Sequence, residues 1–196
     1  MRVVHMDMSE EFLRDLGLSP NPALPSDVDG KCTFTRKGQG GIVVDRWEFT
    51  EQVVLNDGAD AASIADGLKL MSFGSGAKKI VPMWAKIVAT LDDDLADGET
   101  TAGEIGIGST KGTGAVAVLS GTAAMENVMT GQTLGNITAG NTVSVAAETG
   151  GREPLGSVLG FDLYLNHASA FSNESEAHSV RIASGTIIEI AYGVIG

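Results

Sequence analysis

The stretch "SFGSGAKKIVPMWAKIVATL" (residues 72–91) decides between two interpretations of this chain. Glycines followed by lysines can form a loop that holds phosphate, or a tight turn that leads into a strand. A phosphate-binding loop needs the pattern G-x-x-x-x-G-K-[ST] and a helix directly after it. Here the spacing differs, no Ser or Thr follows the lysines, and residues 80–91 alternate between two faces. The stretch therefore predicts a hairpin turn and a β-strand.

The predicted strand has one apolar face and one mixed face. The apolar face is expected to carry Val81, Met83, Ala85, Ile87, Ala89 and Leu91. The other face is expected to carry Trp84, Lys86, Val88 and Thr90. Pro82 lacks the backbone N–H that a ladder needs, which indicates an edge strand or a bulge.

The same two-residue period recurs from residue 31 to the C-terminus. About ten short strands with glycine-containing turns between them predict a sandwich or barrel. Residues 57–67 ("DGADAASIADG") predict one short helix, and residues 122–129 ("TAAMENVM") a helical turn. Because strands and helices do not alternate, a parallel sheet is not expected. The prediction is an all-β, jelly-roll-like antiparallel β-sandwich over residues 31–196.

Residues 1–30 are expected to form a separate N-terminal arm, partly helical and partly extended. Ser9 can cap a short helix, and Gly17 can end it. The following "SPNPALPSDVDG" contains three of the five prolines and predicts an extended segment. So short a helix must be covered by something, which predicts contacts with a neighbouring subunit through Phe12, Leu13, Leu16 and Leu18. A loose terminus is the alternative.

Composition limits the possible partners. The chain has 196 residues, of which 43% are hydrophobic and 19% charged, as in a globular domain. A net charge of −12 argues against binding to nucleic acid or to anionic membranes. The longest apolar runs are too short to span a bilayer, and the N-terminus does not resemble a signal peptide, so synthesis in the cytoplasm is expected. The single cysteine, Cys32, is expected to be a small, at least half-buried side chain and not a nucleophile.

No catalytic residue and no cofactor is predicted, so the protein is not expected to be an enzyme. The chain has no G-x-S-x-G motif, and its three histidines, His5, His167 and His178, are scattered along the sequence. The acidic stretch "DDDLADGETTAGE" (residues 92–104) has suitable calcium ligands at some loop positions, namely Asp93, Asp97, Gly98 and Glu104. It has Leu95 where an oxygen ligand belongs. The stretch is interpreted as a solvated loop, and whether it binds calcium is left open.

Residues 70–91 and the later "EIGIGST" (residues 104–110) resemble parts of small β-rich virion proteins of tailed bacteriophages, of the head decoration or cement type. These proteins often have a glycine–lysine turn that leads into a strand beginning Ile-Val-Pro. The matching residues here are Gly76, Lys78 or Lys79, Ile80, Val81 and Pro82, with one extra lysine. The resemblance extends over residues 67–110 and 155–196.

The resemblance implies a jelly-roll sandwich that assembles as a homotrimer or similar ring on the capsid surface. Its partner would be the major capsid protein, and its function would be to reinforce the joints between capsomers. Two alternatives remain. One is another virion role, as a jelly-roll major capsid protein or a tail or receptor-binding component. The other is a ligand- or sugar-binding β-sandwich.

Overall fold

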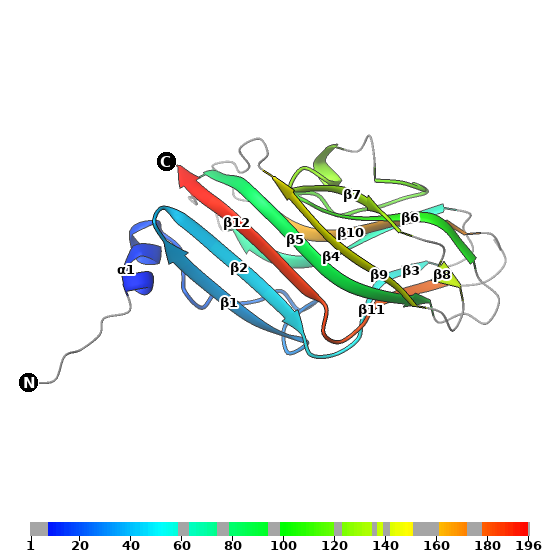
Figure 1. The fold of residues 1–196 in the computed structure, drawn as a ribbon, viewed down its shortest axis with the longest axis horizontal. Helices are drawn as coiled ribbons and strands as arrows, with labels where there is room; N and C mark the ends of the chain where they lie inside the picture. The colour runs from blue at the N-terminus through cyan, green and yellow to red at the C-terminus, as the bar shows by residue number, and fades with distance from the viewer. Residues whose placement is uncertain are drawn as a thin grey trace, which may run out of the picture.

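Two antiparallel β-sheets pack face to face in the computed structural model of this chain (Figure 1). The structure describes residues 8–58, 63–73, 79–93, 99–119, 123–134, 137–138, 142–150, 161–171 and 178–195. The large sheet contains β1 (Cys32–Gln39), β2 (Ile42–Phe49), β3 (Val53–Gly58), β5 (Lys79–Asp93), β9 (Thr142–Gly150), β11 (His178–Ile182) and β12 (Ile187–Ile195). The small sheet contains β4 (Ser63–Phe73), β6 (Glu99–Gly108), β7 (Met129–Thr133), β8 (Ile137–Thr138) and β10 (Phe161–Phe171).

Eight of the described strands pair in the order of a jelly roll. If β2, β4, β5, β6, β7, β9, β10 and β12 are numbered from first to eighth, the first pairs with the eighth and the second with the seventh. The third pairs with the sixth and the fourth with the fifth. The pairs β12–β5 and β10–β6 join this folded ribbon into two sheets. Two Greek keys wrapped in this way make a jelly roll, so the predicted all-β fold is confirmed.

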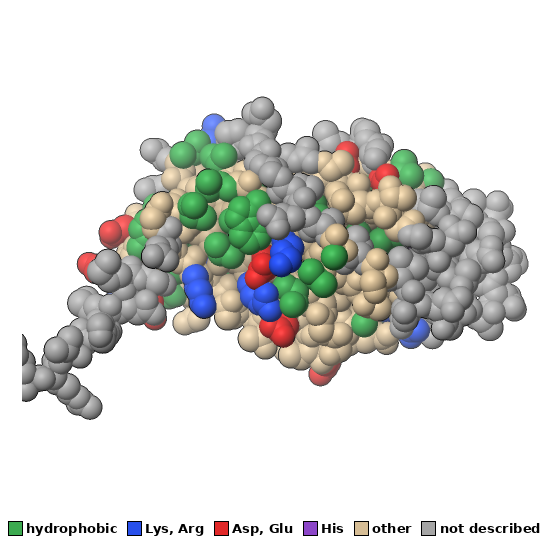
Figure 2. All heavy atoms as spheres, in the orientation of Figure 1, with side chains coloured by type: hydrophobic (Ala, Val, Ile, Leu, Met, Phe, Trp, Pro, Cys, Tyr) green, Lys and Arg blue, Asp and Glu red, His purple; other side chains and the backbone are tan. Residues whose placement is uncertain are grey.

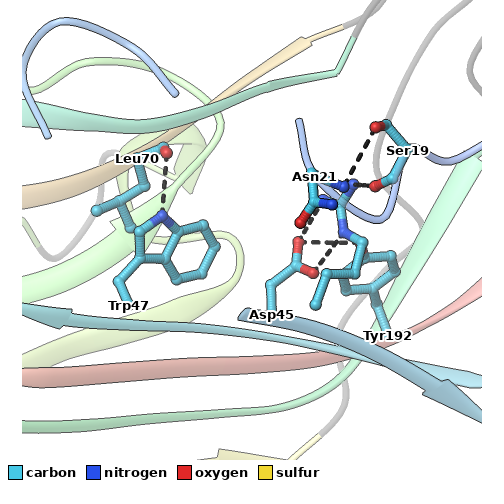
Figure 3. Close-up of polar contacts among 7 residues, drawn as sticks. Ser19, Asn21, Asp45, Trp47, Leu70 and Tyr192 are labelled. Atoms are coloured by element: carbon cyan, nitrogen blue, oxygen red, sulfur yellow. Dashed lines mark hydrogen bonds and ion pairs between the residues drawn. The ribbon is translucent and has the colours of Figure 1, made fainter. Parts of the chain in front are cut away.

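The core lies between the two sheets, because alternate residues of each strand point inward. In β2, Val43, Trp47 and Phe49 are buried, and Ile188 and Ile190 of β12 are buried next to them. The indole Nε1 of Trp47 donates a hydrogen bond of 3.2 Å to the carbonyl of Leu70 in β4, on the opposite sheet (Figure 3). Burial of each of these large apolar side chains stabilises the folded state by about 2 kcal/mol.

The predicted helix over residues 57–67 is wrong. Residues 53–58 belong to β3, and residues 63–67 begin β4, which pairs with β10. Gly67 is not a helix end: a Cβ added there would lie 2.1 Å from Oδ1 of Asn166, so glycine permits a close approach within the sheet. Pairing with a strand about one hundred residues later overrides the local helical pattern. The helical turn expected over residues 122–129 is confirmed as the short 3₁₀-helix Ala123–Met125.

The predicted N-terminal helix is confirmed as α1 (Met8–Asp15). It ends in a Schellman motif, in which Gly17 has a φ of 73°, Gly17 N donates to Arg14 O at 2.8 Å, and Leu18 N donates to Leu13 O at 2.8 Å. The segment after the helix lies against the sandwich, where the carboxylate of Asp27 accepts a hydrogen bond from the backbone N–H of Lys69 at 2.9 Å. The described part of the arm therefore packs on its own chain.

A β-bulge interrupts β5 at the position that Pro82 indicated. Trp84 lies opposite Ala191 and Pro82 lies opposite Tyr192, so Met83 is the extra residue between them. The bulge turns Val81 and Met83 outward, and Met83 is 44% exposed. The prediction that these two side chains share a buried face with Ala85 is therefore wrong, because the added residue reverses the alternation.

Candidate functional site

The outward side of the small sheet is covered by the chain itself. Within residues 109–119 and 123–128, Leu119 and Met125 pack on Ala65 and Ala168 and form a second small core. The buried side chain of Asn166 holds this cover: its Oδ1 accepts from Gly112 N at 2.8 Å, and its Nδ2 donates to Thr110 O at 2.9 Å and Met125 O at 2.7 Å. The carboxylate of Glu104 accepts a hydrogen bond from Leu119 N at 2.8 Å.

No segment that the structure describes covers the outward side of β2, β12 and β5, which faces the viewer in Figure 2. We call this surface the outer face. It comprises Ile42, Val44, Arg46, Glu48, Val81, Met83, Trp84, Lys86, Val88, Ile187, Glu189, Ala191, Gly193 and Ile195. Met83 is 44%, Val88 36% and Ile195 49% exposed, and Trp84 is half-buried. These exposed apolar side chains make the outer face a candidate interaction surface.

A row of charged residues crosses the outer face. Arg46 of β2 donates to Glu189 of β12 at 2.6 Å and to Glu48 at 2.9 Å. Lys86 of β5 lies beside Glu189 on the other side. The hydrogen bonds to Glu189 and then to Glu48 raise the pKa of Arg46. The signs therefore alternate across the three strands, positive on β2, negative on β12 and positive on β5.

The charge of this side differs from that of the whole chain. Among the described side chains that point outward from β1, β2, β5 and β12, four are basic (Lys37, Arg46, Lys79 and Lys86) and two are acidic (Glu48 and Glu189). Four positive and two negative charges give a local net of +2, in a chain of net charge −12. Through these described side chains, two acidic molecules repel one another less than the net charge of the whole chain implies.

A buried ion pair ties the arm to the large sheet from inside (Figure 3). Nε and Nη2 of Arg36 each donate to the carboxylate of Asp45 at 2.6 Å, and Tyr192 OH donates to Asp45 Oδ2 at 3.0 Å. The Nη1 of Arg36 donates to Ser19 O at 3.0 Å. Burial raises the pKa of Asp45, which the hydrogen bonds from Arg36 and Tyr192 oppose. Because these hydrogen bonds are made within the chain, Arg36 stabilises the fold.

The structure places the predicted contact residues against their own chain. Leu13 and Leu18 are buried, and Phe12 and Leu16 are half-buried against the main core. A neighbouring subunit was expected there because the apolar side of the helix needs cover. The sandwich of the same chain provides that cover. Contact of these residues with another subunit stays a prediction. Sequence reasoning did not identify the outer face, although Pro82 was the signal for the bulge that creates part of it.

The histidines and the cysteine do not form a reactive group among the described side chains. His167 is buried beside Ile105 of β6, and burial lowers its pKa to about 4. His5 lies outside the described residues, and His178 begins β11. Cys32 is half-buried, as predicted, and its thiol donates to Val28 O at 3.4 Å. Burial, and then the charge of Asp29, raises its pKa to about 11, so the thiol is protonated at neutral pH.

The calcium alternative is only partly visible in the structure. Asp97 and Gly98 lie outside the described residues, and Glu104 is engaged with Leu119 as stated above. Among the side chains that the structure describes, no group of three or more His, Cys, Asp or Glu residues is placed to hold a metal ion. No helix in the described ranges is both long and apolar enough to cross a membrane.

A polar cleft of about 380 Å³ opens beside β3 and β4. Lys111 Nζ lies 2.7 Å from Asp66 Oδ1 at its wall, and Lys31 Nζ donates to Asp27 O at 3.1 Å. The hydrogen bond to Asp66 raises the pKa of Lys111. The cleft is open to solvent and has charges of both signs at its wall, which is suitable for a small polar ligand. No model of a known protein family matches this chain, and no curated protein is similar to it in sequence.

Proposed function

We propose that this protein is a structural component of a virus particle, a decoration or cement protein on the head of a tailed bacteriophage. The observation that carries the proposal is the jelly-roll pairing of β2, β4, β5, β6, β7, β9, β10 and β12. Viral capsid proteins use this fold, as do lectin domains and cupins. Because a fold alone permits many functions, the proposal also rests on the resemblance of residues 70–91 and 104–110 to phage virion proteins, which favours the virion among these functions.

The surfaces of the molecule support this role. A cement protein works by burying area against its neighbours, and the outer face offers exposed Met83, Val88 and Ile195 for such contact. The strongly acidic remainder of the chain is better suited to the outside of a capsid than to its DNA-filled lumen. In this proposal the partners are further copies of the chain, in a trimer or similar ring, and the major capsid protein. The protein is made in the host cytoplasm and ends on the capsid surface.

Binding to heads tests the proposal directly. Heads that lack a decoration layer, from the particle whose genome encodes this chain, are mixed with the purified protein, sedimented and imaged by cryo-electron microscopy. We expect saturable binding at symmetry-related positions and heads that withstand higher temperature before they release DNA. The absence of binding at saturating protein overturns the cement role. Closed shells formed by the protein alone would instead identify a major capsid protein.

The polar cleft favours a second candidate, a ligand- or sugar-binding module. A ligand that binds only the folded state raises the melting temperature, and at one hundred times its Kd it adds about 2.7 kcal/mol to the free energy of unfolding. Thermal melts with a panel of saccharides, with and without calcium, test this candidate. A rise that Lys111→Ala abolishes would support it, and an unchanged melting temperature across the panel would count against it.

A further inference from the structure

We propose that the outer face binds the same face of a second copy of this chain, about a twofold axis that runs between β12 and β5, along the strands. A twofold contact uses one surface twice, so the surface must be complementary to itself. The proposal concerns the free protein in solution. It concerns the same outer face that the proposed function uses for contact with neighbours, but the two fail by different results: a trimer in solution overturns this dimer, whereas the absence of binding to heads overturns the cement role.

The charged row selects this axis. About an axis between β12 and β5, Glu189 of each copy faces Lys86 of the other, because the two residues lie side by side on these strands. About an axis along β12, Glu189 would face itself, and Arg46 on β2 would face Lys86 on β5. Like charges placed opposite one another are strongly disfavoured in an interface. The alternation of sign therefore fits one arrangement and opposes the other.

The apolar residues fit the same arrangement. Ile187 of one copy faces Val88 of the other, because they are neighbours across the axis. Further along, β5 carries the bulky Val81, Met83 and Trp84, whereas β12 carries Ala191 and Gly193 opposite them. Ala191 is buried beneath its neighbours and Gly193 has no side chain, so β12 projects least where β5 projects most. Val81 of each copy thus faces Gly193 of the other, which is a large-to-small match, whereas Ala191 is already covered within its own chain.

The size of the face is sufficient for a stable dimer. Strands lie about 4.8 Å apart and rise about 3.3 Å per residue. The outer face and the two strands that flank it, β1 and β9, comprise five strands of eight residues or more, which together span roughly 24 by 27 Å. That area, about 650 Å² per partner, corresponds to about 1,300 Å² in total, which lies at the lower end of the range of roughly 1,200–2,000 Å² for specific interfaces.

Sedimentation velocity over a concentration series tests the contact. We expect the wild-type protein to reach twice the chain mass of 20.2 kDa. Met83→Glu and Met83→Lys should each weaken the dimer at least tenfold, because each places a charge in the apolar part of the interface. Val54→Glu is the matched control: Val54 is 46% exposed but lies on β3, away from the outer face, so its dimer should be unchanged. A wild-type monomer, a trimer, or a dimer that is insensitive to Met83 overturns the proposal.

Two charge variants test the position of the axis. Lys86→Glu alone and Glu189→Lys alone each place like charges opposite one another in the dimer, so both should dissociate. Mixed together, a Lys86→Glu copy and a Glu189→Lys copy have opposite charges at both contacts and should form a heterodimer. The ion pairs within each chain are the same in the mixture as in the single variants. Recovery of a dimer in the mixture therefore shows that these residues make contact between chains. A mixture that sediments as the sum of its two components overturns this axis. Circular dichroism confirms that each variant is folded.

Discussion

The outward sides of the two sheets differ in whether the described chain covers them. On the small sheet, residues 109–119 and 123–128 lie over the surface, and Leu119 and Met125 bury the outward Ala65 and Ala168. On the large sheet, Met83, Val88 and Ile195 remain exposed on the outer face. The comparison teaches that an apolar outward side requires a cover, which the chain supplies on one sheet and which a second copy supplies, in our proposal, on the other.

The cover of the small sheet is held by polar side chains of the sheet itself. Asn166 and Glu104 are buried, and their hydrogen bonds go to backbone groups of the covering segment. The buried polar groups described on the large sheet, Arg36 and Asp45, point inward instead and hold the arm. The large sheet thus has an anchored interior and a free exterior, which is the arrangement that a docking surface requires.

The largest expected effect concerns the interior of the large sheet. Asp45→Asn leaves Arg36 buried without its counter-ion and should lower the free energy of unfolding by about 4 kcal/mol. Tyr192→Phe removes one hydrogen bond to the same carboxylate and should cost about 1 kcal/mol. Urea unfolding of both variants gives the comparison. Equal, small losses for both would show that this ion pair does not anchor the sheet.

Release of the cover on the small sheet should have the next largest effect. Asn166→Ala leaves Gly112 N, Thr110 O and Met125 O without their partner and should cost about 3 kcal/mol. Asn127→Ala is the control, because Asn127 bonds to Ser109 in the same segment but is only half-buried, and it should cost about 1 kcal/mol. Binding of the dye ANS should rise for the first variant alone. If Asn166→Ala is as stable as wild type, the cover is held by other contacts.

The free energy of unfolding should depend on pH through His167, the buried histidine of the small sheet. Burial lowers the pKa of His167 from 6.5 to about 4, so the unfolded chain binds a proton that the folded chain does not between these values. Stability from this group is complete above pH 6.5 and decreases as the pH falls, by about 3 kcal/mol by pH 4. Unfolding of wild type and His167→Gln from pH 7.5 to 4 measures the difference. Parallel curves for the two proteins would contradict the lowered pKa.

The smallest changes compare one methionine on each outward side. Met125→Ala removes a side chain of the cover that is 8% exposed where it packs on the small sheet, and it should cost about 2 kcal/mol. Met83→Ala removes one that is 44% exposed on the outer face and should change the stability of the dilute monomer by less than about 0.5 kcal/mol. Thermal melts at low protein concentration give both values. A large loss for Met83→Ala in the monomer would mean that the outer face is already covered within one chain.

Local patterns in the sequence determined the type of most elements. The alternation in residues 80–91 predicted β5, and Ser9 and Gly17 predicted the bounds of α1 to within a residue or two. The hairpin predicted before β5 is wrong, because β4 lies in the small sheet and β5 in the large one. These signals are readable because the period of two and the φ of a helix-ending glycine depend on neighbouring residues only. The helix predicted over residues 57–67 failed because burial of Ala65 and the close approach to Asn166 come from β10, far along the chain.

By itself, then, the sequence determined an all-β chain with a short N-terminal helix and a half-buried cysteine. The tertiary structure alone decided the jelly-roll strand order, the outward turn of Met83 and the row formed by Arg46, Glu189 and Lys86. The physical reason is separation along the chain. Arg46 and Glu189 are 143 positions apart, and alternation shows that a strand has two faces without showing which strand will lie beside it.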